Sequence, residues 1–481
     1  MLLPAIFPVT CHTKHVGPGS TFVAIAGFTN NGTAFIPQAL LQGATTIVID
    51  ENQITPDLIA ICTQYKAILS PVQEPRKALA LLAANALNNP ADKLHIIGIT
   101  GTKGKSTTAF ITEHLLRKAG FKTALISTIY NKILQNIEQS THTTPEADYL
   151  HMFFARCVQE GVTHVVMEVS SHALSLDRVH GITFAAVGFT NLAPEHLDFY
   201  DTMERYFSAK AQLFSHTKKQ SLIVLNADDA WATQACIAAQ KAADITGAVV
   251  HTYGQDEATT NNHTTMHIHQ ASCDGIELIL ERKPALFLTC LHLFGVFNCY
   301  NIAMATIIGL HLGLSYTDVI KGIGSFKGVA GRLQRHVLKN GALAFVDYAH
   351  NASSMEAVLK TLHPFTRDLI IVFGCGGDRD TTKRPMMGAL ASTYGTQVII
   401  TDDNPRTEDR MAIINQIIAG IPTTNTASVH VIPHRREAIN YAASVAQPDS
   451  IIALLGKGHE NYHFIGTESF HFDDFEEISK F

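Results

Sequence analysis

Apolar residues recur along the chain as short runs that end in polar residues and lead into helical patterns. Before about residue 88, the runs TFVAIAG (21–27) and TTIVID (45–50) are rich in β-branched residues and predict strands. Between them, AFIPQALLQGA (34–44) predicts a short helix that ends at Gly43. We therefore expect a small α/β domain over residues 1–88.

From Lys93 onward the pattern changes, and similar units recur in which an apolar run ends in polar residues and is followed by a helical pattern. The runs are LHIIGIT (94–100), HVVMEVS (164–170), FAAVGFTNL (184–192) and SLIVLNADD (221–229). Such alternation predicts a mostly parallel sheet covered by helices, which we assign to a central domain over residues 89–328. Residues 255–292 alternate more like antiparallel strands, and we expect them to form a side sheet.

A third block begins near Gly331 and again alternates strand-like runs with turns that contain Gly or Asp. The runs are ALAFVDYAH (342–350), DLIIVFGCGG (368–377), QVIITDDNP (397–405), SVHVIP (428–433) and SIIALLGKG (450–458). They resemble a doubly wound, Rossmann-like fold over residues 329–481, in which functional groups collect beyond the carboxyl ends of the strands. A chain of 481 residues is also too long for one core, so the fold class is α/β with three domains.

The composition excludes several classes of function. With 36 Lys and Arg against 42 Asp and Glu the net charge is −6, which argues against nucleic acid as a partner. No segment is long and apolar enough for a membrane helix, and the start of the chain lacks the basic region of a signal peptide. The eight cysteines are scattered and form no CxxC pair, so we expect free thiols in a reducing, cytoplasmic compartment.

A glycine-rich loop lies between the predicted strand 94–100 and the helical pattern that follows it. Its residues are Gly101, Thr102, Lys103, Gly104, Lys105, Ser106 and Thr107. Glycines let backbone amides turn toward phosphate oxygens, and the helix N-terminus adds a favourable dipole. In this setting Lys105 would reach the β- and γ-phosphates and the Ser106 hydroxyl would bind Mg²⁺. The spelling GxxGKS is shorter than the usual P-loop, and the alternative is a glycine-rich turn with exposed lysines.

Three further side chains are candidates for chemistry beside this loop. Glu168 ends a predicted strand, where an acidic side chain can hold the metal ion of a bound nucleotide. Lys210 lies in a helical pattern whose apolar face we expect to be buried, and a buried lysine is partly neutral and able to react with CO₂ to give a carbamate. His196 follows the end of another predicted strand. Taken singly, His196 also fits a hydrogen-bonded loop histidine, and Lys210 also fits a lysine that reaches out to solvent.

A set of motifs in a fixed order resembles the Mur ligase family. Beside the phosphate loop, the set comprises EVSSHAL (168–174), the stretch 191–214, GVFNCYN (295–301), GVAGRLQ (328–334), VDYAHN (346–351), GCGGDRDTTKRP (374–385), DDNPR (402–406) and GKGHE (456–460). The resemblance runs from about residue 10 to residue 470. It implies an N-terminal UDP-binding domain, a central ATP-binding domain and a C-terminal domain that binds an amino acid.

Within the family, the motif Asp403-Asn404-Pro405-Arg406 resembles that of members which add meso-2,6-diaminopimelate to UDP-N-acetylmuramoyl-L-alanyl-D-glutamate. Diaminopimelate has an extra carboxylate, which Arg406 and Arg379 can bind through fork-shaped pairs. Gly456 and Glu460 match further positions that contact this amino acid, and Glu460 suits its distal ammonium group.

The resemblance also implies roles for residues elsewhere in the chain. Lys210 matches a carbamylated lysine, and Glu168 and His196 match Mg²⁺ ligands. Contacts to ATP are implied for Asn298, Asn301, Arg332, Asp347 and His350, and contacts to the nucleotide-peptide substrate for Thr13, Phe28, Thr29, Asn30, Thr143, Thr144, Ser170 and Arg178. The expected cofactors are ATP, Mg²⁺ and the carbamylated lysine, the partners are small-molecule substrates, and we expect a monomer with no membrane insertion.

The implied reaction is amide-bond formation through an acyl phosphate, as a step of peptidoglycan precursor synthesis in the bacterial cytoplasm. Positioning and electrostatics would do most of the catalysis. Four alternatives remain at this point: a lysine-adding Mur ligase, a folylpolyglutamate synthase, a nucleotide-dependent switch without ligation, and a catalytically inactive binding protein.

Overall fold

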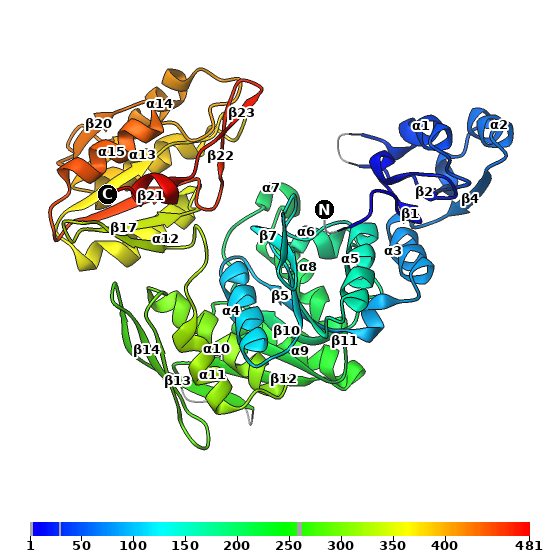
Figure 1. The fold of residues 1–481 in the computed structure, drawn as a ribbon, viewed down its shortest axis with the longest axis horizontal. Helices are drawn as coiled ribbons and strands as arrows, with labels where there is room; N and C mark the ends of the chain where they lie inside the picture. The colour runs from blue at the N-terminus through cyan, green and yellow to red at the C-terminus, as the bar shows by residue number, and fades with distance from the viewer. Residues whose placement is uncertain (1–2, 28–29, 257–261) are drawn as a thin grey trace. The chain divides into compact units, whose positions relative to one another are not determined.

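The computed structural model describes residues 3–27, 30–256 and 262–481. They form two compact units, of which one comprises Met1–His267, Leu280–Leu286 and Tyr300–Ile323. The other comprises Ile268–Ile279, Phe287–Cys299 and Gly324–Phe481. Three α/β sheets follow one another along the chain (Figure 1), which agrees with the predicted fold class. The predicted domain boundaries stay a prediction.

The first sheet has four parallel strands in the order β1 (Val9–Thr10), β2 (Thr21–Val23), β3 (Thr46–Asp50) and β4 (Ile68–Val72). Its helices are α1 (Ile36–Leu41), α2 (Pro56–Gln64) and α3 (Pro75–Ala86). The helix expected over residues 34–44 is shorter, because a 3-10 turn at Gly32–Phe35 precedes it and Pro37 occupies its first turn. In Figure 1, α3 lies against α5 (Ala147–Gln159) of the next sheet.

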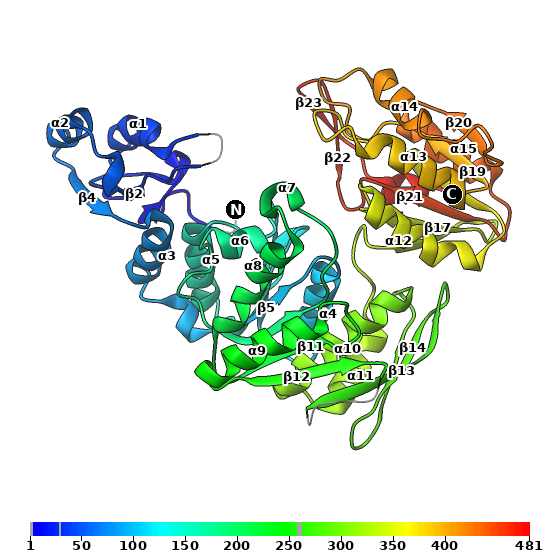
Figure 2. The ribbon, with the colours of Figure 1, turned by 180° about the vertical axis from the view of Figure 1, so that it is seen from behind.

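The central sheet has a parallel middle in the order β12 (Val249–Gly254), β11 (Thr217–Asn226), β10 (Phe184–Phe189), β5 (His95–Thr100), β9 (His164–Glu168) and β6 (Thr123–Ile126). Two antiparallel strands, β7 (Tyr130–Ile133) and β8 (Asn136–Gln139), follow β6. The helices of this region are α4 (Lys105–Lys118), α5, α6 (Ser171–Ser175), α7 (Leu197–Tyr200), α8 (Met203–Ser215), α9 (Ala232–Thr246), α10 (Val296–His311) and α11 (Tyr316–Ser325). Figure 2 shows α9 alongside β11 and β12.

The side sheet that the alternating residues 255–292 predict does not form a separate sheet. Residues 263–265 of β13 (His263–Ser272) pair in parallel with β12, and β14 (Gly275–Leu280) and β15 (Leu286–Cys290) follow β13 in the same sheet. The alternation itself is present, since β15 has buried and exposed residues in turn. Unpaired backbone groups at the edge of β12 accept a further strand, so the alternating strands extend the central sheet.

The third sheet has the order β16 (Gln334–Val337), β17 (Leu343–Asp347), β21 (Ile451–Leu455), β18 (Leu369–Phe373), β19 (Gln397–Ile400) and β20 (Ser428–Val431). All its pairs are parallel except β16–β17, and a hairpin of β22 (Tyr462–Ile465) and β23 (Glu468–His471) lies outside it.

Both faces of this third sheet are buried, because successive strand residues point to opposite sides. Leu369, Ile371 and Phe373 belong to a core with α12 (Ala352–Leu362), α13 (Lys383–Tyr394) and α14 (Arg410–Ile418). Ile370 and Val372 belong to a second core with α15 (Arg435–Val445) and α16 (Asp474–Ile478).

Two expectations from composition can be compared with the structure. All eight cysteines are free, and six of them are buried, as expected for a chain without a disulfide framework. Among the residues that the structure describes, no helix has both the length and the hydrophobicity that a bilayer crossing requires.

Candidate active site

The glycine-rich loop lies between β5 and α4, as the sequence predicts, and needs both of its glycines. Gly101 and Gly104 have positive φ angles of +137° and +85°. A Cβ atom on Gly101 would lie 2.0 Å from the Thr190 hydroxyl oxygen, and one on Gly104 would lie 2.5 Å from Oδ1 of Asn301. The Nζ atom of Lys105 donates to the carbonyl oxygens of Gly101 (3.0 Å) and Thr102 (2.8 Å). Only glycine therefore fits these turns, and the lysine folds back over the loop.

The end of the neighbouring strand β10 holds this loop in shape. The backbone N–H of Lys103 donates to Oδ1 of Asn191 (2.9 Å), and the Asn191 amide donates back to the Lys103 carbonyl (2.9 Å). The Thr190 hydroxyl donates to the same carbonyl at 2.6 Å. Sequence reasoning gave Thr190 and Asn191 no role, although their position directly after a strand next to β5 was a usable signal.

Glu168, at the end of β9, is fully buried and accepts three hydrogen bonds. The donors are the Ser106 hydroxyl (2.9 Å), the Thr128 backbone N–H (2.8 Å) and the Thr128 hydroxyl (3.2 Å). The strand-end carboxylate and the first turn of α4 thus meet, as expected from a parallel β5–β9 pair. Carboxylate and hydroxyl oxygens are ligands that Mg²⁺ accepts, usually together with phosphate oxygens and water.

Lys210 lies on the buried face of α8 and is 1% exposed. Its Nζ atom donates to the Gly101 carbonyl oxygen (2.8 Å) and lies 4.6 Å from the ring centroid of Tyr206. Burial, and then the charge of Lys105, lower the pKa of Lys210 well below its usual value, against the opposing charge of Glu195. The alternative of a lysine that reaches solvent is therefore wrong, and an uncharged amine beside the phosphate loop is favoured.

His196 precedes α7 in a left-handed conformation with φ of +57°. It is exposed, and its ring lies 4.8 Å from that of His172 and 6.0 Å from that of Tyr206. Within the described ranges, no cluster of three or more His, Cys, Asp or Glu side chains could hold a metal ion. A metal ion bound here would therefore need, beside Ser106 and Glu168, further ligands from the nucleotide, from water or from a modified lysine.

Four of the residues expected to contact the nucleotide-peptide substrate, Thr143, Thr144, Ser170 and Arg178, form one cluster beside Glu168. The Thr144 hydroxyl donates to the Glu168 carbonyl oxygen (2.9 Å) and accepts from the Ser170 N–H (3.0 Å). Arg178 donates to the Thr144 carbonyl (2.7 Å) and pairs with Glu146 (2.6 Å). The neighbouring Thr143 accepts from the Thr128 hydroxyl at 3.1 Å.

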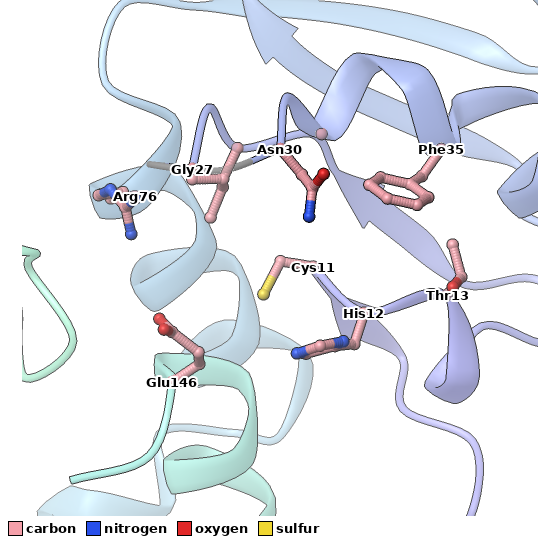
Figure 3. A pocket seen from close by; sticks show the side chains of 10 residues that line it. Cys11, His12, Thr13, Gly27, Asn30, Phe35, Arg76 and Glu146 are labelled. Carbon is pink, nitrogen blue, oxygen red and sulfur yellow. The ribbon is translucent and has the colours of Figure 1, made fainter. Parts of the chain in front are cut away.

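A cavity of about 410 Å³ lies between the first sheet and the start of α5 (Figure 3). Its lining includes the predicted Thr13 and Asn30, whereas Phe28 and Thr29 lie outside the described residues. Sequence reasoning missed the other lining residues, which are Cys11, His12, Ile25, Gly27, Gly32, Phe35, Arg76 and Glu146. Because these come from four separate parts of the chain, no local pattern identifies them.

The buried carboxylate of Asp148 in α5 forms hydrogen bonds with the segment of the cavity wall that contains Cys11. It accepts from the Thr10 hydroxyl (2.7 Å) and from the Cys11 backbone N–H (3.2 Å). Burial, and then the charge of Asp148, raise the pKa of the Cys11 thiol well above its usual value, so this cysteine is a neutral lining group.

In the second compact unit, Asn404 and Glu460 meet although they follow different strands. The Asn404 amide donates to the Glu460 carboxylate at 2.9 Å, and Lys457 lies 3.4 Å from the same oxygen. Burial, and then the charge of Asp403, raise the pKa of Glu460, which Lys457 and Asn404 partly offset. Gly456 has φ of +111°, and a Cβ there would lie 2.5 Å from the Asp403 carboxylate.

The two arginines expected to bind a carboxylate lie beside the same glycine. A Cβ on Gly376 would lie 3.0 Å from Nη1 of Arg406 and 3.7 Å from Cγ of Arg379. Arg406 has φ of +51° and donates to the carbonyl oxygen of Gly377 at 2.7 Å. A Cβ on Gly377 would lie 1.9 Å from the carbonyl oxygen of Pro405. The Nη1 atom of Arg406 and the Cγ atom of Arg379 thus lie beside one glycine position, that of Gly376.

The expected ATP contacts fall in both compact units. In the first, Oδ1 of Asn301 accepts from the Thr108 hydroxyl of α4 at 3.1 Å. In the second, the ring of His350 lies 4.7 Å from the ring of Tyr348, and the guanidinium group of Arg332 lies 5.0 Å from the same ring. Sequence reasoning missed Tyr348. Asp347 and Asn298, the remaining two residues, bind backbone groups. The Asp347 carboxylate accepts from the backbone N–H groups of Leu333 and Ala349, and the Asn298 amide donates to the carbonyl oxygen of Phe294.

Comparison with known proteins adds an independent observation. Family models match residues 6–86 (Mur ligase family, catalytic domain), 99–309 (Mur ligase middle domain) and 331–458 (Mur ligase, glutamate ligase domain). UDP-N-acetylmuramoyl-L-alanyl-D-glutamate–2,6-diaminopimelate ligases from Synechococcus elongatus and Bacillus cereus are each 39% identical to this chain. The alignments cover 98% and 99% of it, and 93% and 94% of those proteins.

Solved structures of similar fold include a ligase with the same name and a folylpolyglutamate synthase. A ligase of the same name is 30% identical with a TM-score of 0.69, and covers 99% of this chain and 94% of its own. A folylpolyglutamate synthase from Mycobacterium tuberculosis, at 18% identity and a TM-score of 0.61, covers 80% of this chain and 93% of its own and shares the fold alone. Relatives of this identity over nearly the whole length establish that the chain belongs to the Mur ligase family.

Proposed function

We propose that this ATP-dependent ligase joins meso-2,6-diaminopimelate to UDP-N-acetylmuramoyl-L-alanyl-D-glutamate, a step of peptidoglycan precursor synthesis. The observation that carries the proposal is the likeness, at 39% identity over almost the whole chain, to ligases with that activity in their names. The arrangement of Arg379, Arg406, Asn404 and Glu460 supports the choice of amino acid.

Diaminopimelate has two amino-acid ends, and the loops of the third sheet offer groups of both charges. Arg379 and Arg406, beside Gly376, suit the distal carboxylate because a guanidinium group binds a carboxylate through two parallel hydrogen bonds. Glu460 suits the distal ammonium group. Lysine lacks the distal carboxylate, so a lysine-adding enzyme would have no use for two arginines in these loops.

The proposed reaction is the one that the family resemblance implies, and the loop geometry is consistent with it. The D-glutamate γ-carboxylate attacks the γ-phosphorus of ATP, ADP leaves, and an acyl phosphate forms. The amine of diaminopimelate then attacks the acyl carbon, loses a proton and expels phosphate. Lys105 and the N-terminal amides of α4 stabilise the negative charge that develops on the transferred phosphoryl group. Mg²⁺, when bound, would be held by Ser106, Glu168 and His196 and would neutralise charge on the phosphate oxygens.

The remaining proposed group at this site is a carbamate on Lys210. An uncharged buried amine reacts with CO₂, and the resulting anion would add a second negative ligand beside Glu168. We expect Lys210→Ala to lose ligation and to regain part of it with added short carboxylates, whereas Gln212→Ala on the exposed side of α8 keeps activity. Isotopically labelled CO₂ gives a readout separate from activity, because the parent and Gln212→Ala should show a carbamate signal by NMR and Lys210→Ala should not. Full activity of Lys210→Ala would refute the carbamate.

The direct test of the proposal supplies ATP, Mg²⁺ and the UDP-linked dipeptide with either meso-diaminopimelate or L-lysine. We expect ADP and phosphate to appear with diaminopimelate only, and Arg406→Lys to reduce the preference because it removes the fork-shaped donor. Preferred incorporation of lysine would refute the assignment. The nucleotide substrates favour the bacterial cytoplasm as the site of action, and we expect a monomer, which size-exclusion chromatography with light scattering checks.

The folylpolyglutamate synthases share the fold and are the second candidate. Their match covers 80% and 78% of this chain, against 98% for the diaminopimelate ligase from Synechococcus elongatus. Turnover of ATP with a folate and glutamate, but not with the UDP-linked dipeptide, would favour this alternative.

A further inference from the structure

A buried ion pair in the second compact unit has no role in the reaction described above. Arg435, the first residue of α15, donates from Nε and Nη2 to the two carboxylate oxygens of Asp474 at 2.7 Å and 2.6 Å. Asp474 is the first residue of α16, and both side chains are fully buried. Removing two charges from water is costly, so a pair of this kind is weak evidence for a gain in stability and calls for another explanation.

The same guanidinium group also binds two backbone carbonyls at the edge of the sheet. Nη1 donates to the carbonyl oxygen of Asp402 and Nη2 to that of Leu455, each at 3.0 Å. Leu455 ends β21, and Asp402 follows β19 after one intervening residue. These strands are not neighbours, because β18 lies between them. Arg435 therefore connects two strand ends that the hydrogen bonds of the sheet do not join directly.

Both strand ends lead directly into the loops proposed to bind the amino acid. Asp402 precedes Asp403 and Asn404, and Leu455 precedes the segment from Gly456 to Glu460. The two loops meet where the Asn404 amide donates to Glu460 at 2.9 Å. The distance between the two strand ends therefore sets how the amide and the carboxylate face each other.

We propose that Arg435, oriented by Asp474 of the C-terminal helix α16, is a positioning residue that fixes the spacing of the two amino-acid-binding loops. This inference rests on the proposed function of those loops. The carboxylate holds the guanidinium plane through two parallel bonds, so the remaining N–H groups point at the two carbonyls in a fixed geometry. The C-terminal helix thus acts on the affinity for the amino acid without touching it.

A second ion pair between the same two helices supplies a matched control. Arg436 pairs with Glu477 at 3.0 Å, and its side chain is 59% exposed. It lies next to Arg435 on α15, and its guanidinium group contacts Glu477 and the ring of Phe472. A variant at Arg436 therefore weakens the attachment of α16 and leaves the hydrogen bonds to the two strand ends in place.

The test compares Asp474→Asn, Arg435→Lys and Arg436→Gln in the full-length enzyme. Asparagine keeps the size of the side chain but loses the charge and one acceptor, and lysine keeps the charge but cannot reach a carboxylate and two carbonyls together. For both we expect KM for diaminopimelate to rise by about tenfold or more, since small misplacements of binding groups are costly. We expect KM for ATP and kcat to stay within about twofold, and Arg436→Gln to leave all three unchanged.

Four outcomes would overturn the inference. One is an unchanged KM for diaminopimelate in folded Asp474→Asn and Arg435→Lys. Another is an equal rise of all KM values in step with the fall in Tm, or the same change in Arg436→Gln. Failure of both buried-pair variants to fold would assign the pair to stability alone. A parent enzyme that does not use diaminopimelate would instead refute the proposed function, so the two failures are distinguishable.

Discussion

The hydrogen bonds of Glu168 predict that one substitution lowers activity with little effect on stability, whereas another lowers both. In Glu168→Gln, the amide oxygen can still accept from the Thr128 backbone N–H, now 2.8 Å from the carboxylate. The amide N–H₂ group then faces the hydroxyls of Ser106 and Thr128, which can rotate to accept. Thr128 also has Thr143 as an alternative acceptor for its hydroxyl, at 3.1 Å. No buried group loses its partner, so we expect a loss in unfolding free energy of only about 1 kcal/mol.

The alanine variant removes the acceptor altogether. Glu168→Ala leaves the Thr128 N–H without a partner, which costs about 1–3 kcal/mol, and a further loss follows from the cavity left at a fully buried site. A total of about 3 kcal/mol is expected from these two contributions. Activity should fall in both variants, by about 10²–10³-fold in kcat, because both remove the negative charge proposed to hold the metal ion.

Urea unfolding at neutral pH gives the two stabilities, and ADP release with both co-substrates gives kcat as a function of Mg²⁺ concentration. We expect Glu168→Gln to require more Mg²⁺ than the parent enzyme. Near-parent turnover and Mg²⁺ dependence in Glu168→Gln would refute the metal-binding role. Equal destabilisation of the two variants would refute the reasoning from hydrogen bonds.

Two further predictions concern buried residues. His151 is buried with no hydrogen-bond partner at either ring nitrogen, and burial lowers its pKa to about 4. Burial of the neutral ring costs no extra stability above about pH 6.5, whereas the parent loses stability as pH falls toward 4 because only its unfolded state binds the proton. In urea unfolding, the free energy of unfolding of His151→Leu should therefore rise by about 3 kcal/mol relative to that of the parent over this interval. A difference that does not depend on pH would contradict this. A Cβ on Gly377 would lie 1.9 Å from the Pro405 carbonyl oxygen, so Gly377→Ala should displace the loop and raise KM for diaminopimelate, with a loss of about 2 kcal/mol. The control is Gly324→Ala near the end of α11, where the atom nearest to an added Cβ lies 3.9 Å away. This variant should be neutral or stabilising in thermal unfolding, and equal effects of the two substitutions would contradict the steric argument.

The periodic features of the chain were predictable because they depend on neighbours in sequence. The run 94–100 followed by GTKGKST gives strand, turn and helix from local residue types, and the structure has β5, the loop and α4 at those positions. The two faces of β18 follow from its continuous apolar residues. The expectation of a separate side sheet was wrong because alternation reports which face is buried but not which strand is the partner.

The sequence by itself determined the elements, the phosphate loop and the kinds of side chain at the strand ends. The tertiary structure decided which of them meet. Ser106 and Glu168 are 62 residues apart and Lys210 is 109 residues from Gly101, and each pair is brought into contact by the order of the strands and the packing of α8. Arg435 reaches Asp402 and Leu455 across β18 for the same reason. Contacts of this kind depend on long-range strand pairing, and local patterns of residue type carry no record of it.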